Sequence, residues 1–289
     1  MSSSLLVRAQ NIVRLSFLSD AATMPLHWIY DQNKITSILT SNPNGNNNPI
    51  FYPILSCAYY KYNFGYLSPW GDESLPFLKS LSDYGSFNNE NIAESYYNYF
   101  KTYEVETIDK PFIGRLNHVP KEFIKNREEA KELKDCAIND FQSHGIIRVP
   151  ILVARYLGNP NLSSIVEDAV GILQSTTISK QSSVLLAKLL EYSLLHDISM
   201  KVILEENHYH TIDDFENNII SFIRSDQAIA EYVAFNDRLT EAIPSSADDP
   251  YRKNRIIGAM FSGIYHSYNC WFISGDNDHH TNYYNHHHN

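Results

Sequence analysis

Hydrophobic residues along this chain recur mainly at intervals of three and four positions, the spacing that places them on one face of an α-helix. The first such face is formed by Leu5, Ala9, Ile12, Val13 and Phe17, and Pro25 is expected to end its helix. Further helices are predicted over residues 74–81, 92–103, 121–135, 163–175, 179–196, 211–223 and 254–268, and residues 143–158 consist of a breaker followed by a deeply apolar run. No ladder of short alternating strands accompanies them, so the pattern predicts an all-α domain of many helices.

Loops are predicted where turn-forming residues gather. Residues 41–49 form one loop by composition, and residues 64–74 form a second irregular stretch. Asp72 or Ser74 is expected to cap the helix that follows the second loop, with Pro76 in its first turn. Residues 274–289 are rich in Asn and His and cannot bury a core, which predicts a disordered tail after a single domain of residues 1–273.

The composition is that of a soluble globular protein, with 43% hydrophobic and 19% charged residues. A net charge of -10 argues against nucleic acid as a partner, because phosphate binding requires an excess of Lys and Arg. No apolar run reaches the ~18 residues of a membrane span, and Arg8 and Arg14 interrupt the N-terminal segment where a secretory signal would lie. Cys57, Cys136 and Cys270 are far apart, which favours a reducing compartment. We therefore expect a cytoplasmic protein.

Two acidic loops precede predicted helices, and each has two interpretations. One contains Gly71, Asp72 and Glu73, and the other contains Asp248 and Asp249. A carboxylate at a helix start commonly caps free N–H groups and interacts favourably with the helix dipole. Two such loops that converge could instead bind a hard cation, because Mg²⁺ and Ca²⁺ prefer oxygen ligands. These residues alone leave both interpretations open.

Two further stretches combine groups that could bind a ligand. In the first, Arg148 could pair with a phosphate through two hydrogen bonds, and Gly145 allows a close approach of the backbone to a ligand. The alternative is an ordinary loop with a surface arginine and a turn glycine. In the second, His27 and Trp28 follow Pro25, and the alternative is a helix end that packs aromatic side chains into the core.

Four stretches of the chain, taken in order, resemble the ADP-ribosylglycohydrolase family, and most nearly its J1-crystallin branch. They are SDAATMPLHWIYD (19–31), SPWGDES (68–74), NDFQSHGIIRVPILVARYLG (139–158) and ADDPYRKNRIIGAMFSGIYH (247–266), and the resemblance spans about residues 5–268. It implies an all-α, single-domain orthogonal bundle of many helices, with a cleft where several loops converge.

The resemblance also implies a reduced metal site. Active members of the family hold the ADP-ribose end of the substrate with two Mg²⁺ ions. In this chain, Asp72 and Asp249 match metal ligands of that family, whereas Gly71 stands where another aspartate would be. Tyr251 and Arg252 replace two further ligands of the last loop. Because so few carboxylates remain, the resemblance implies at most one Mg²⁺ ion.

Two functions follow from this resemblance. The first is an enzyme that hydrolyses a glycosidic bond of ADP-ribose, with an ADP-ribose-type ligand or an ADP-ribosylated protein as its partner, and neither nucleic acid nor a membrane. Its catalytic base would be Glu73, and its substrate-binding residues would be His27, Gln142, His144, Gly145 and Arg148. The second is a catalytically inactive, crystallin-like structural or ligand-binding protein on the same fold, which the reduced set of metal ligands favours.

Overall fold

The computed structural model describes residues 3–29, 31–42, 50–57, 59–60, 62–104, 114–140, 142 and 144–197 of the 289-residue chain. The helices predicted over 211–223 and 254–268, the predicted metal ligand Asp249 and the predicted tail over 274–289 lie outside the described residues. The structure therefore tests the predictions for the first two thirds of the chain.

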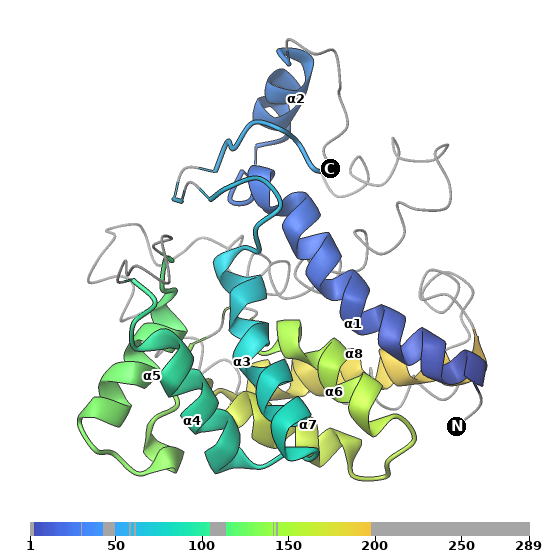
Figure 1. The fold of residues 1–289 in the computed structure, drawn as a ribbon, viewed down its shortest axis with the longest axis vertical. Coiled ribbons are helices and arrows are strands. Elements are labelled where there is room, and N and C mark those ends of the chain that lie inside the picture. Colours follow the sequence, from blue (N-terminus) through green and yellow to red (C-terminus); the bar gives the residue numbers. More distant parts are fainter. Residues whose placement is uncertain are drawn as a thin grey trace, which may run out of the picture.

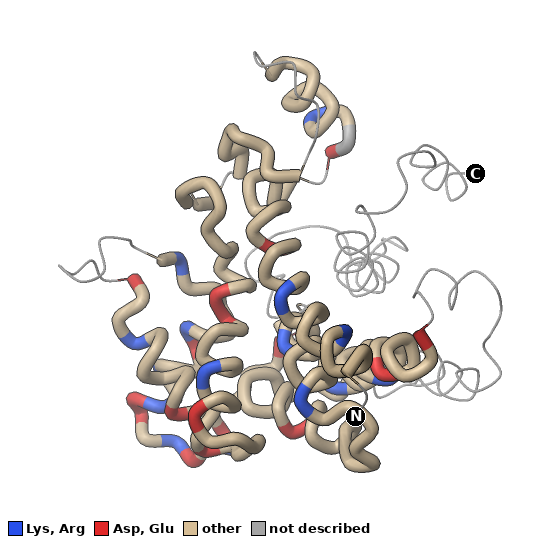
Figure 2. The backbone as a smooth tube through the Cα atoms, turned by 45° about the vertical axis from the view of Figure 1, so that its right-hand side comes forward, with Lys and Arg blue, Asp and Glu red and all other residues tan. Residues whose placement is uncertain are grey.

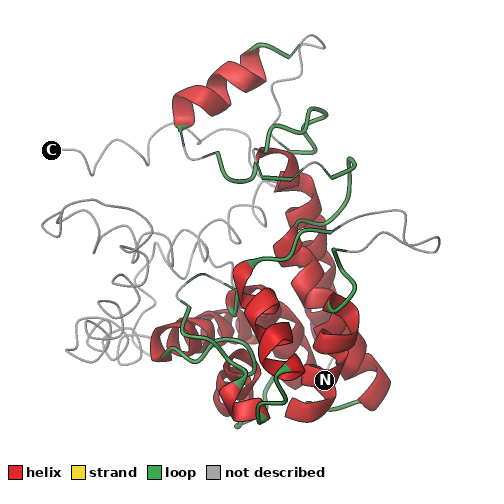
Figure 3. Cartoon of the chain, turned by 90° about the vertical axis from the view of Figure 1, so that its left-hand side faces the viewer, coloured by secondary structure: helices red, strands yellow, loops and turns green. Residues whose placement is uncertain are grey.

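The described residues form an all-α structure, as predicted. Its α-helices are α1 (Ser3–Thr23), α2 (Gln32–Thr40), α3 (Pro69–Tyr84), α4 (Asn89–Phe100), α5 (His118–Glu128), α6 (Val149–Tyr156), α7 (Leu162–Gly171) and α8 (Thr177–His196). Short 3-10 helices lie at η1 (Met24–Leu26), η2 (Leu133–Asp135) and η3 (Ile146–Arg148). Within the described ranges, extended pairing is limited to an isolated parallel bridge between Ile138 and Gln174, and Figure 3 shows helices joined by loops.

The predicted end of the first helix is confirmed, but the predicted start of the next long helix is not. α1 ends at Thr23, and Pro25 lies in η1 directly after it. α3 begins at Pro69, because the Ser68 hydroxyl accepts hydrogen bonds from the backbone N–H groups of residues 70 and 71. The prediction that Asp72 or Ser74 caps this helix is therefore wrong, and Pro76 lies inside the helix rather than in its first turn.

The charged segment 121–135 was expected to be one helix, and this prediction is wrong at both ends. α5 begins at His118 and ends at Glu128, after which Ala130 adopts a left-handed conformation with φ of 57°. The buried Asn126 side chain donates a hydrogen bond to the carbonyl of Cys136 and so joins the helix to the chain that returns past it. This contact lies between residues ten positions apart, which a local sequence pattern does not reveal.

The main core lies among α3 to α8, with α1 packed along one side (Figure 1). α3 packs on α4, α7 packs on α8, and α6 packs between α1 and α8. Fully buried apolar side chains in this core include Phe77, Phe123, Leu152 and Leu173. In Figure 1, α2 lies beyond the far end of α1, away from α4, α5 and α7. The C-terminal end of α1 thus lies outside the main core, beside the first turn of α3.

Charged residues of both signs are interspersed along the described helices rather than gathered on one of them (Figure 2). None of the described helices is both long and apolar enough to cross a lipid bilayer.

Candidate functional site

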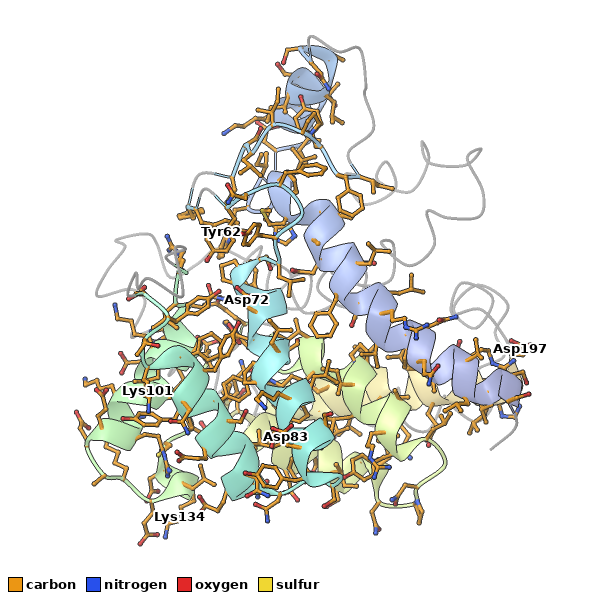
Figure 4. All side chains as sticks on the ribbon, viewed as in Figure 1. Tyr62, Asp72, Asp83, Lys101, Lys134 and Asp197 are labelled. Carbon is orange, nitrogen blue, oxygen red and sulfur yellow. The ribbon has the colours of Figure 1, made fainter. Side chains whose placement is uncertain are left out.

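The predicted catalytic base and one predicted metal ligand lie in the first turn of α3. This turn is surrounded by the end of α1, the chain that follows α4, the start of α5 and the loop before η3. In Figure 4, Asp72 lies at one end of α3, close to Tyr62, whereas Asp83 lies at the opposite end of the same helix. All of these elements meet at the first turn of α3.

Asp20, in the last turn of α1, ties that helix to the start of α3. Its Oδ2 accepts a hydrogen bond of 2.7 Å from the backbone N–H of Ser68, and its Oδ1 accepts one of 2.5 Å from the Ser68 hydroxyl. The Ser68 hydroxyl in turn caps α3. The Asp20 carboxylate also fills the space beside Gly71, where a Cβ would overlap with it. Gly71 is therefore required by the packing of α1 against α3.

Burial raises the pKa of Asp20 to about 6, although its hydrogen bonds with Ser68 act in the opposite direction. A pKa above the ordinary value of 3.8 means that the folded protein binds this proton more tightly than the unfolded chain does. The contribution of Asp20 to stability is therefore fully present below pH 3.8 and is lost as the pH rises through about 6.

We accordingly expect the stability of the protein, relative to that of an Asp20→Asn variant, to increase as the pH falls from 7 to about 5. The Asn variant cannot titrate at this position, so it removes the pH dependence of every other group from the comparison. Urea unfolding of both proteins across this range provides the measurement. A difference in unfolding free energy that does not change with pH would contradict the expectation.

Asp72, the predicted metal ligand, faces tyrosines. Its Oδ2 accepts a hydrogen bond from the Tyr103 hydroxyl, and the side chain is 9% exposed. Burial raises the pKa of Tyr62 to about 12, and burial together with the nearby Asp72 charge raises the pKa values of Tyr99 and Tyr103. These phenols therefore stay protonated, and the Tyr103 hydroxyl donates to the carboxylate.

Glu73, the predicted catalytic base, is completely buried. Nδ1 of His144 lies 2.9 Å from its Oε1 and 2.8 Å from its Oε2, and the Asn117 side-chain amide donates to Oε1 at 2.9 Å. Both carboxylate oxygens therefore have partners inside the protein. The backbone carbonyl of Glu73 accepts a further hydrogen bond, from the hydroxyl of Tyr96 on α4.

Arg148, a predicted phosphate contact, is 1% exposed and belongs to the same buried cluster. Its Nε donates to the Tyr96 hydroxyl at 2.9 Å, and Nη2 lies 3.8 Å from Oε2 of Glu73. In the described structure, Nη1 and Nη2 of Arg148 and Nε2 of His144 are buried without a hydrogen-bond partner. The charge of Arg148 is thus offset by Glu73 and by the Tyr96 ring, whose centroid lies 5.2 Å from the guanidinium carbon.

The other predicted substrate-binding residues divide between core and surface. Gly145 lies against α7 and α8, where an added Cβ would come within 2.8 Å of Val170 and 2.9 Å of Ser183. The Gln142 side chain is exposed, while its backbone carbonyl accepts from the Gln174 amide at 2.7 Å. Their close contacts are with the protein itself, and a role in substrate binding stays a prediction for both.

His27 lies beside a small aromatic cluster. Its Nε2 is 3.0 Å from the Thr23 hydroxyl and its Nδ1 is 2.9 Å from the Tyr60 hydroxyl. Trp70, in the first turn of α3, stacks on Trp28 with ring centroids 4.9 Å apart and lies 6.1 Å from the His27 ring. The structure therefore places His27 at the same end of α3 as Asp72 and Glu73, within a packed aromatic environment.

The described residues do not by themselves fit a Mg²⁺ ion. The carboxylates of Asp20, Asp72 and Glu73 are directed at three separate sets of partners. No group of three His, Cys, Asp or Glu side chains in the described part of the chain is arranged to hold a metal. Mg²⁺ requires about six oxygen ligands in near-octahedral geometry. That Asp72 and Asp249 share an ion stays a prediction, because Asp249 lies outside the described residues.

Sequence reasoning missed several residues that decide how this centre is built. Tyr103 and Asn117 contact Asp72 and Glu73 from 31 and 44 positions away, and no local pattern connects them. Ser68 could have been found, because a serine followed by proline is a common start of a helix. Recognising Ser68 as the residue that caps the helix would have placed Asp72 and Glu73 inside the helix rather than before it.

Comparison with known proteins agrees with the resemblance seen in the sequence. Crystallin J1A of Tripedalia cystophora is 28% identical over 200 residues, and crystallin J1B of the same organism is 26% identical over 200 residues. The chain is similar to the J1 crystallins. Each match covers 65% of this chain and 59% of the relative's length. No protein-family model matches the chain. The predicted similarity to the J1-crystallin branch is thus confirmed at the level of sequence.

Proposed function

We propose that this J1-crystallin-like chain is a non-catalytic structural protein, and that the centre at the start of α3 stabilises its fold. One observation carries the proposal. Glu73, the predicted catalytic base, is 0% exposed, and both of its carboxylate oxygens are engaged by His144 and Asn117. A general base must reach the proton that it removes, directly or through one water. Glu73 instead serves as an internal counter-charge and hydrogen-bond acceptor.

The contacts of Arg148 support the same interpretation. A phosphate-binding arginine presents its guanidinium to the ligand, and two of its N–H groups commonly bind two oxygens. The guanidinium of Arg148 is enclosed between Tyr96 and Glu73, which places it among core residues. The similarity to proteins named crystallins is in keeping with a structural role.

The test is a direct assay of the full chain. Purified protein is incubated with Mg²⁺ and a protein carrying labelled ADP-ribose, and the release of ADP-ribose is measured. We expect no release above that of the buffer, in a sample whose circular dichroism confirms the helical fold. Release that disappears in a folded Glu73→Gln variant would establish an enzyme and overturn the proposal.

A further inference from the structure

We infer that Asp72 acts in this chain as the acceptor of a tyrosine latch, a structural link that takes the place of the cation implied by the resemblance. The latch consists of Asp72, Tyr103 and Tyr62. This inference deepens the proposed function, and it rests on the proposal that the start of α3 has a structural role. The contacts around Asp72 carry it, independently of those around Glu73.

Tyr103 is positioned to donate to Asp72. It follows α4 directly, and its hydroxyl donates to Oδ2 of Asp72 in the first turn of α3. Its ring packs edge-on against Phe100, with centroids 5.0 Å apart, and against Gly114, where an added Cβ would overlap with the ring. The backbone N–H of Gly114 donates to the carbonyl of Tyr103 at 3.0 Å. Tyr103 is therefore held from several sides in the orientation that directs its hydroxyl at Asp72.

The latch extends from Tyr103 to the segment around Tyr62. A side-chain hydrogen bond joins Tyr103 to Tyr62, and the Tyr62 hydroxyl accepts a hydrogen bond of 2.6 Å from the backbone N–H of Arg115. Tyr62 and Tyr103 are 3% exposed, so the latch lies away from solvent. It connects the start of α3, the end of α4, the segment around Tyr62 and the chain that leads into α5.

A cation at Asp72 would find few suitable ligands among the described residues. Phenol hydroxyls are weak ligands for Mg²⁺, which prefers carboxylates, carbonyls and water. The two other carboxylates described at the start of α3 have partners of their own: Asp20 accepts from Ser68, and Glu73 lies within hydrogen-bond distance of His144. Among the described residues, the surroundings of the Asp72 carboxylate therefore suit hydroxyl donors better than a divalent ion.

The experiment compares the thermal unfolding midpoints of the wild-type protein and five variants. Tyr103→Phe removes only the donating hydroxyl, Asp72→Ala removes the acceptor, and their combination measures coupling. Tyr97→Phe is the matched control, because Tyr97 lies on α4, shortly before Tyr103, and is a half-buried tyrosine whose ring lies under Lys101. We expect Tyr103→Phe to lower the midpoint by about 2–6 °C and Tyr97→Phe to change it little.

Coupling and metal dependence decide the outcome. In the Asp72→Ala background, Tyr103→Phe should cause little further loss, because its partner is already gone. Asp72→Asn, which keeps an acceptor oxygen, should lose less than Asp72→Ala, and about 10 mM Mg²⁺ should leave the wild-type midpoint unchanged. A Mg²⁺-induced rise that disappears in Asp72→Asn would overturn the inference, as would equal effects of Tyr103→Phe and Tyr97→Phe. Release of ADP-ribose in the assay above would overturn only the proposed function.

Discussion

Replacement of Glu73 by Ala is expected to lower the free energy of unfolding by about 3–5 kcal/mol, the cost of removing one partner from a buried ion pair. The change takes the acceptor away from Nδ1 of His144 and from the Asn117 amide. It also leaves the buried guanidinium of Arg148 without the carboxylate that lies 3.8 Å from it. Urea unfolding followed by tryptophan fluorescence measures the loss.

Glu73→Gln separates the charge of this side chain from its shape. The amide keeps an acceptor oxygen but removes the negative charge, so we expect an intermediate loss of about 1–3 kcal/mol. Asp83→Asn is the matched control, because Asp83 lies on the same helix, is half exposed and pairs with Lys79 at 2.6 Å (Figure 4). Its effect should stay within about 0.5 kcal/mol. A Glu73→Ala protein as stable as this control would contradict a structural role for Glu73.

Substitution of Gly71 by Ala is expected to destabilise the protein by about 3 kcal/mol, at the upper end of the range for added bulk in a packed site. The added methyl would overlap with the Asp20 carboxylate, which is held by hydrogen bonds from Ser68. Either α1 must move away from α3 or the hydrogen bonds must break. The unfolding free energy of the variant measures this cost.

A double-mutant cycle tests whether Asp20 is the cause. In the Asp20→Ala background the carboxylate is absent, so Gly71→Ala should cost little and could even gain about 1 kcal/mol of helix propensity. Gly171→Ala, in the last turn of α7, is the matched control, because the nearest atoms belong to the flexible end of Lys180. Equal losses from Gly71→Ala in both backgrounds would rule out the overlap with Asp20.

Local spacing of apolar residues was enough to predict most of the helices. α4, α7 and α8 lie where residues 92–103, 163–175 and 179–196 were expected to be helical, with ends displaced by a few residues. Helical hydrogen bonds join residues four positions apart, so the information for them lies within each segment. The boundaries of α3 and α5 were missed because Ser68 and Asn126 act through contacts that the apolar spacing does not report.

The sequence by itself determined that the chain is helical, that it resembles the J1 crystallins, and that acidic residues gather at the start of one helix. Only the tertiary structure decided what those carboxylates contact. Asp72 and Glu73 are neighbours in sequence, but successive helical residues point about 100° apart. One carboxylate therefore reaches Tyr103 and the other reaches His144, 31 and 71 positions away. Such partners are chosen by the packing of whole helices, which no short stretch of sequence contains.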